Sequence, residues 1–158
     1  MSRTVTNVVI TGLGGQGVLK ASDILADAAF RAGLDVKKSE THGMSQRGES
    51  VASDVRFGRE VLSPMVPPGE AEYLVVLAPD QVEVNRARLR PGGILISPDL
   101  LGEDGLPDRR SLNVALLGRL STHLDIVEAD WLAAIRANLP EELHEANQAA
   151  FAIGRRPT

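Results

Sequence analysis

The sequence contains no cysteine among its 158 residues. Without thiolates the chain cannot ligate an iron–sulfur cluster, form a disulfide or present a thiol nucleophile, so any redox centre must lie on another chain. Aromatic residues make up only 3% of the sequence, and the net charge is −4. Few rings are therefore available to stack on bases, and no broad charge attracts a phosphodiester backbone. Nucleic acid is not expected as a partner.

Long hydrophobic runs are also missing. The longest uncharged apolar stretch covers residues 74–78, whereas a helix that crosses a bilayer needs roughly 20 apolar residues. The first ten residues hold too short an apolar segment for a secretory signal peptide, and they lack a small-residue cleavage site. We therefore expect a cytoplasmic protein with no membrane segment.

The length and composition indicate one domain. With 43% apolar and 24% charged residues, the sequence has ordinary globular usage, and its length suits one hydrophobic core. We expect a single α/β domain over residues 1–158. Within it, residues 1–98 form the sheet core and residues 111–154 form helices packed on that core.

The N-terminal region has the pattern of a strand, a glycine loop and a helix. β-branched residues over 4–11 predict a strand that stops at glycines. Residues 12–17, GLGGQG, form the loop. Small and apolar residues at three- and four-residue spacing then predict a helix over 18–32, which Gly33 ends. This unit is Rossmann-like.

The remaining sequence alternates between strand and helix patterns before it becomes wholly helical. We expect a polar loop over 41–48, strands over 35–39, 51–57, 72–77 and 94–96, a return strand over 60–63 after the second of these, and helices over 79–91, 112–124, 129–139 and 140–153. This order predicts a three-layer α/β/α domain with a mixed, mostly parallel sheet and a helical C-terminal segment.

Gly12, Gly14 and Gly17 match the pattern G-x-G-x-x-G between a predicted strand and a predicted helix. Such glycines let a phosphate approach the free N–H groups of a helix start, or they simply permit a tight turn. A dinucleotide site also needs an acidic residue that ends the second strand, and here Glu40 comes only after Lys-Lys-Ser. A stand-alone Rossmann-type reductase or nucleotide-sensing domain is kept as the alternative function.

Two longer segments carry a family resemblance. Residues 10–19 (ITGLGGQGVL) and 39–48 (SETHGMSQRG) resemble the γ-type subunits of 2-oxoacid:ferredoxin oxidoreductases, which include the pyruvate, ketoisovalerate and indolepyruvate enzymes. The HGMSQRG form is most similar to the small subunit of the indolepyruvate enzymes. The resemblance runs through residues 7–57 and continues over 113–118 and in the last helix. One departure is Glu49, where the family usually has glycine.

The resemblance implies a place in a larger enzyme. The family decarboxylates 2-oxoacids oxidatively with thiamine diphosphate, passes electrons through iron–sulfur clusters to ferredoxin, and transfers the acyl group to coenzyme A. This chain has neither cluster cysteines nor a thiamine pattern. We therefore expect an accessory subunit that binds no cofactor alone, is inactive alone, and assembles with thiamine- and cluster-binding partner subunits. A homodimer of the isolated chain is left open.

The resemblance also selects a candidate site with no catalytic residue in this chain alone. Both loops of this site follow carboxyl ends of predicted strands, where open α/β sheets bind ligands. They are expected to line one surface that docks on the thiamine-binding partner or receives the phosphates of coenzyme A. The residues expected to face a ligand or partner are Gly12, Gly14, Gly15, Gln16 and Gly17 in the first loop, and His42, Gly43, Met44, Ser45, Gln46, Arg47 and Gly48 in the second.

Two side chains of the second loop could carry chemistry. An imidazole titrates near neutrality, so His42 could serve as an acid or base, or it could only bond a backbone group. Arg47 could clamp a carboxylate or phosphate, or it could pair with Glu40 or Glu49. The serines lack the partners of a hydrolase triad, and the three histidines lie too far apart for a metal site, so no bound metal is expected.

Overall fold

Five strands form one sheet with the order β2-β3-β1-β4-β5 in the computed structural model, which describes residues 5–42, 49–102 and 106–157. The strands are β1 (Val5–Leu13), β2 (Asp35–His42), β3 (Ser50–Gly58), β4 (Ala71–Val76) and β5 (Leu89–Ile96). β3 runs antiparallel to both of its neighbours, whereas β1, β4 and β5 pair in parallel. The sheet is therefore mixed, with only β3 reversed, which confirms the predicted fold class.

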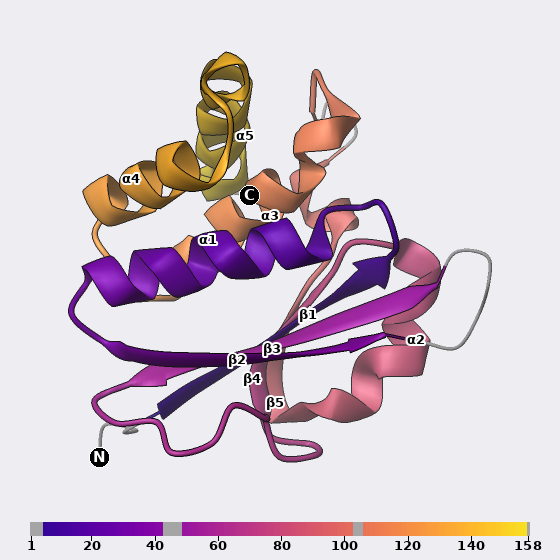
Figure 1. Cartoon of the computed structure of the whole chain (residues 1–158). Coiled ribbons are helices and arrows are strands. Elements are labelled where there is room, and N and C mark those ends of the chain that lie inside the picture. The colour runs from indigo at the N-terminus through magenta and orange to yellow at the C-terminus, as the bar shows by residue number, and fades with distance from the viewer. Residues whose placement is uncertain (1–4, 43–48, 103–105, 158) are drawn as a thin grey trace.

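Helices cover both faces of this sheet, but unequally. They are α1 (Val18–Arg31), α2 (Val82–Asn85), α3 (Leu112–Ser121), α4 (Glu128–Asn138) and α5 (His144–Arg155). Figure 1 shows α1 and α3 on one face, with α4 and α5 farther out, and the short α2 on the other. α4 packs on α1 and α5 packs on α3. Within the described residues, no helix is both long and apolar enough to cross a membrane.

The central strand β1 contributes to a separate core on each face. Val8 and Ile10 join the large core that also contains apolar residues of α1 and of the C-terminal helices. Val9 points the other way, into a small cluster with Leu74 and Val76 of β4. Because both faces of β1 and β4 are covered, each strand has a run of three apolar residues without alternation, over 8–10 and 74–76.

α3 and α5 cross at very short range. A Cβ atom built on Gly118 would lie 2.2 Å from the carbonyl oxygen of Phe151, and one built on Gly154 would lie 1.8 Å from that of Ala115. Only glycine lets the two backbones approach this closely. Trp131 of α4 is fully buried against the same junction, with its ring 5.6 Å from that of Phe151.

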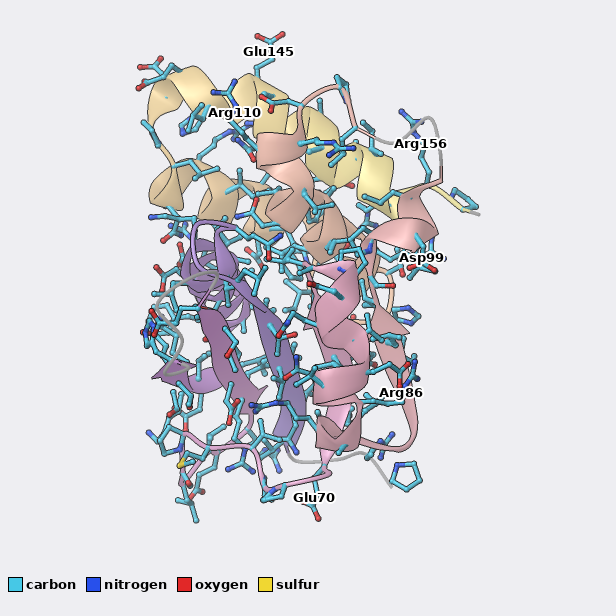
Figure 2. The ribbon with its side chains drawn as sticks, turned by 90° about the vertical axis from the view of Figure 1, so that its right-hand side faces the viewer. Glu70, Arg86, Asp99, Arg110, Glu145 and Arg156 are labelled. Atoms are coloured by element: carbon cyan, nitrogen blue, oxygen red, sulfur yellow. The ribbon has the colours of Figure 1, made fainter. Side chains whose placement is uncertain are left out.

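Charged side chains keep to the outside of this arrangement. Figure 2 shows labelled acidic and basic residues projecting outward from loops and helix surfaces at the edge of the molecule, among them Glu70, Arg86 and Glu145. Arg86 pairs with Glu83 one helical turn away, at 2.9 Å, on the exposed side of α2. Such exposed pairs contribute little to stability, so the apolar cores and the helix crossing hold the fold.

The structure corrects two strand ends near the glycine loop. β1 continues through Gly12 and Leu13, so the loop begins at Gly14 rather than at Gly12. β2 continues to His42, which was expected in the loop. The antiparallel ladder with β3 extends both strands, because Gly12 and His42 lie in register on either side of Val51.

The predicted return strand over 60–63 is wrong. β3 has β1 on one side and β2 on the other, so no edge is left for a third partner. The segment over 59–70 is instead a loop held by carboxylates. Asp35 accepts a hydrogen bond from the Val61 N–H at 2.7 Å, and Asp54 accepts one from the Val66 N–H at 2.9 Å.

The predicted helix over 79–91 is also wrong in extent. Only the single turn of α2 is α-helical, with 3₁₀ turns at Pro79–Gln81 and Arg86–Arg88. β5 already begins at Leu89, paired with Ala71 of β4. The three C-terminal helices have the expected order, although α3 ends at Ser121 and α5 starts at His144.

The close crossing of α3 and α5 predicts the sign of the stability change in a Gly118→Ala variant. By helix propensity alone, Gly118→Ala should stabilise the protein by about 1 kcal/mol. Because the new methyl group would overlap the Phe151 carbonyl, we expect destabilisation by about 1–3 kcal/mol instead, as for other overpacked cores. Chemical denaturation measures the difference. Ala149→Gly, at an exposed position of α5, calibrates the propensity effect, and a stabilised Gly118→Ala variant would contradict the close crossing.

Candidate functional site

The glycine loop connects β1 to α1, and three hydrogen bonds hold it in place. The Gly14 N–H donates to the backbone oxygen of Glu49 at 2.7 Å, and the Gln16 N–H donates to that of Leu13 at 3.1 Å. The Gln16 side-chain Oε1 accepts from the Leu13 N–H at 2.7 Å. Gln16 therefore braces the loop internally, a role that the sequence motif did not reveal.

The glycines in and beside this loop are under different constraints. Gly15 and Gly17 have φ angles of 87° and 83°, in the left-handed region that other residues avoid. Gly12 lies within β1, and a Cβ there would come within 2.8 Å of the Gln16 Oε1 atom. Gly14 has neither constraint, because its φ is not positive and a Cβ would lie 3.7 Å from the nearest atom.

The second predicted loop is described only at its two ends. Gly43, Met44, Ser45, Gln46, Arg47 and Gly48 lie outside the described residues. The His42 Nδ1 atom lies 3.7 Å from the Glu49 Oε1 atom, and the two side chains are 51% and 41% exposed. Glu49 thus contacts the glycine loop through its backbone and His42 through its carboxylate.

The two ends of this second loop and the glycine loop border one groove. The groove has a volume of about 480 Å³, with Gly14, Gly15 and Gly17 on one side and His42 and Glu49 on the other. Apolar residues of β1, α1 and β3 complete its wall, and the exposed Lys20 adds a cation that the sequence analysis had not selected. The groove therefore presents one ammonium, one imidazole and the Glu49 carboxylate to an incoming group.

A second hollow lies on the other side of the glycine loop. It has a volume of about 490 Å³ and is lined by Gln16, by residues that follow β4 and β5, and by Arg109 and Leu112 before and within α3. β1 and β4 are parallel neighbours whose connections run to opposite faces of the sheet. Such switch points are where open α/β sheets bind ligands. Residues of the glycine loop therefore line both the groove and this second hollow.

Glu40, the late acidic residue of β2, is already engaged. Lys38 donates to both Asp23 and Glu40, at 2.9 Å to the latter. Burial lowers the pKa of Lys38, but the two carboxylates outweigh burial and raise it overall. The ammonium therefore stays charged, and Glu40 is held by this pair. In the parts of the chain that the structure describes, no three histidine or acidic side chains are placed to hold a metal ion.

Asn113 is the site residue whose role sequence reasoning missed. It lies in the first turn of α3, is 7% exposed, and its Nδ2 donates to the Gly17 carbonyl at 3.1 Å. The only signal in the sequence was its place in the Asn-x-x-x-Leu-Gly segment that resembles the oxidoreductase subunits. No local pattern could join two residues 96 positions apart.

The fold and the groove define a class: an open-sheet α/β domain whose candidate site is made of surface loops at the carboxyl ends of its strands. Residues 7–107 match the model of the pyruvate ferredoxin/flavodoxin oxidoreductase family. The chain belongs to this family, which confirms the resemblance drawn from its motifs.

The curated relatives are subunits of such enzymes. The chain is 42% identical over 125 residues to the indolepyruvate oxidoreductase subunit IorB of Thermococcus kodakarensis, a match that covers 79% of this chain and 60% of that protein. The subunit of the same name from Methanothermobacter thermautotrophicus is 29% identical over 187 residues, with 94% of this chain and 95% of that protein covered. The chain thus spans less than two thirds of the first relative.

Solved structures share the fold. The γ subunit of a keto/oxoacid ferredoxin oxidoreductase from Geobacter sulfurreducens superposes with a TM-score of 0.78 at 22% identity, and 94% of this chain and 95% of that chain are covered. A 2-oxoglutarate:ferredoxin oxidoreductase from Magnetococcus marinus gives a TM-score of 0.80 at 23% identity. That match covers 98% of this chain and 31% of the other, so the same fold occurs there within a longer chain.

The three loop glycines predict a ranked series of alanine variants. Gly14→Ala should change the free energy of unfolding by no more than about 0.5 kcal/mol, since nothing conflicts with its Cβ. Gly15→Ala should cost about 1–2 kcal/mol for the left-handed backbone. Gly17→Ala should cost more than Gly15→Ala, because its Cβ would also lie 2.5 Å from the Asn113 Nδ2 atom. Urea denaturation checks the order, and equal values for all three would contradict the loop geometry.

Proposed function

We propose that this chain is the small, γ-type subunit of a 2-oxoacid:ferredoxin oxidoreductase, with indolepyruvate as the favoured 2-oxoacid. The observation that carries the proposal is the 42% identity to an indolepyruvate oxidoreductase subunit, supported by a related subunit that matches along nearly its whole length. The HGMSQRG segment favours the same member of the family.

The chain's own residues argue for an accessory role. Iron–sulfur clusters are held by thiolates, and the sequence has none. The sequence also lacks the thiamine-binding pattern that the resemblance assigns to other subunits of these enzymes. Both cofactors are therefore assigned to the partner subunit, and the isolated chain is proposed to be inactive.

The groove beside the glycine loop is proposed as the surface that meets the partner. It combines the N-terminal turn of α1 with Lys20 and His42, and the positive end of the helix dipole and these two side chains suit a phosphate or carboxylate brought in from outside. Coenzyme A, which is present in the Magnetococcus marinus structure, carries such phosphates. We propose that the groove closes the partner's active site or receives these phosphates.

Two observations weigh against the Rossmann-type alternative. In a dinucleotide fold the second strand lies next to the first, whereas here β3 is inserted between β2 and β1. Two strand spacings, about 10 Å, therefore separate the ends of β1 and β2. In addition, Glu40, the residue that would have to bind the ribose hydroxyls of a dinucleotide, is paired with Lys38.

Reconstitution tests the proposal. The chain is co-expressed with the thiamine- and cluster-binding oxidoreductase subunit of the same organism, and dye reduction is measured with indolepyruvate, pyruvate and 2-oxoglutarate. A stable complex that needs both chains for activity is expected. Calorimetry of the isolated chain with NAD(H) and NADP(H) is the counter-test, because tight dinucleotide binding, or turnover by this chain alone, would contradict the accessory role.

Arg47 supplies a specific prediction for the reconstituted complex. If it holds a carboxylate or phosphate in a desolvated crevice, Arg47→Ala should weaken activity or partner affinity by about 2–5 kcal/mol, since the opposing charge loses its partner. A pair confined to the surface would instead cost no more than about 1 kcal/mol and fade with salt.

The measurement compares activity and partner affinity at low and high salt. Arg86→Ala is the matched control, because this exposed arginine pairs with Glu83 on α2, on the opposite face of the sheet. Glu49→Gly removes the carboxylate that faces His42 and restores the family residue, so it separates the contribution of that pair. Full activity of Arg47→Ala at both salt concentrations would exclude a functional role for this arginine.

A further inference from the structure

Asn113 joins the starts of two helices that are far apart in the sequence. Its Nδ2 donates to the carbonyl of Gly17, the residue that caps α1, and its Oδ1 accepts from the Val114 N–H at 2.9 Å. The first N–H groups of a helix have no partner within the helix, so the second bond satisfies one such group of α3. One buried amide thus serves α1 and α3 together.

The contact between Asn113 and Gly17 is too close for a side chain at position 17. Gly17 has a φ of 83° and no side chain, and any Cβ placed there would lie 2.5 Å from the Asn113 Nδ2 atom. The Gly17 carbonyl also accepts the Ala21 N–H of α1, at 2.9 Å. The orientation of this peptide group, and with it the last turn of the glycine loop, is therefore fixed by α1 from one side and by Asn113 from the other.

The position of Asn113 is in turn set by the C-terminal helices. α3 crosses α5 through Gly118 and Gly154 at backbone contact. Arg155 of α5 donates to the Ser121 hydroxyl at 2.7 Å, and that hydroxyl donates to the Gly118 carbonyl at 2.6 Å. α3 is therefore rigidly held at the end far from Asn113, and a shift of α5 would carry Asn113 with it.

We infer that Asn113 is a positioning residue, through which the α3–α5 pair holds the glycine loop in the conformation that the groove requires. Gly14, Gly15 and Gly17 line that groove together with His42 and Glu49. The inference about the loop stands on these contacts alone, whereas its consequence for assembly rests on the proposed function. Asn113 touches no reacting group in this account and acts only through the loop.

The amide can be tested apart from its size. Asn113→Asp keeps the shape and the acceptor for the Val114 N–H, and a carboxylate in the first turn of α3 is favoured by the helix dipole. It loses the donor to Gly17 and places a carboxylate oxygen opposite the Gly17 carbonyl oxygen instead. Asn113→Ala removes the donor without adding a charge. Asn147→Asp is the matched control, because Asn147 is equally buried and its Nδ2 donates to the Leu143 carbonyl at 2.9 Å, within the C-terminal helical region.

Hydrogen exchange of the full chain is the first measurement, at the Gly14 and Gln16 amides that bond across the loop. We expect exchange about 2- to 13-fold faster in Asn113→Asp and Asn113→Ala, the factor that corresponds to one net hydrogen bond. Exchange in the ladders of β1 and β4 should stay unchanged, as should both loop amides in Asn147→Asp. A merely structural role would instead accelerate exchange throughout the chain in proportion to the loss of stability.

Affinity for the thiamine- and cluster-binding subunit is the second measurement, and it should fall by a similar factor in the Asn113 variants only. Unchanged loop exchange in both variants would overturn the inference about the loop, whereas faster loop exchange with unchanged affinity would overturn its consequence for assembly. Failure of the wild-type chain to bind that subunit would instead overturn the proposed function. In that case the exchange comparison still decides whether Asn113 holds the loop.

Discussion

The antiparallel insertion of β3 beside β1 is the constraint on which the site depends. The ladder runs from Val5 opposite Gly58 to Leu13 opposite Ser50, so the start of β3 lies beside the end of β1. Glu49, the residue before β3, is thereby brought next to the glycine loop, where its carbonyl oxygen accepts a hydrogen bond from the Gly14 N–H. In a purely parallel sheet the β2–β3 connection would not return to this edge, and the two loops would not share a groove.

Local patterns in the sequence were enough for the elements whose burial is simple. The apolar run of β4 and the three- and four-residue spacing of α1 predicted both elements, because each is buried along its length. The strand order could not be predicted, since pairing β3 with β1 depends on contacts between residues 37 to 53 positions apart. The return strand over 60–63 failed for this reason, because a local hairpin was assumed where a distant strand already held the edge.

Proline and glycine misled the prediction between residues 79 and 93. Pro91, Gly92 and Gly93 suggested the end of a helix, but they lie within β5. β5 is an edge strand of the sheet, and its register with β4 shifts between Leu89 and Ile94. Edges and bulges tolerate proline because its missing N–H is not needed for the ladder. The same residues in a central strand would have broken it, so their meaning depends on a position in the sheet that the sequence does not state.

The glycine motif pointed to the candidate site, but it did not reveal what each of its residues does there. Gln16, expected to face a ligand or partner, also accepts the Leu13 N–H and so closes the loop, and Gly12 provides space for that side chain. Asn113 likewise holds the Gly17 backbone through its side-chain amide, and Gly118 and Gly154 let the backbones of α3 and α5 touch. Lys20, by contrast, lines the groove and is exposed. Most of these motif residues therefore fix the shape of the surface, whereas Lys20 is exposed on it. Motif residues that hold the shape of a surface, rather than react, are consistent with the proposed role of this chain, in which the surface meets a partner subunit that carries the cofactors.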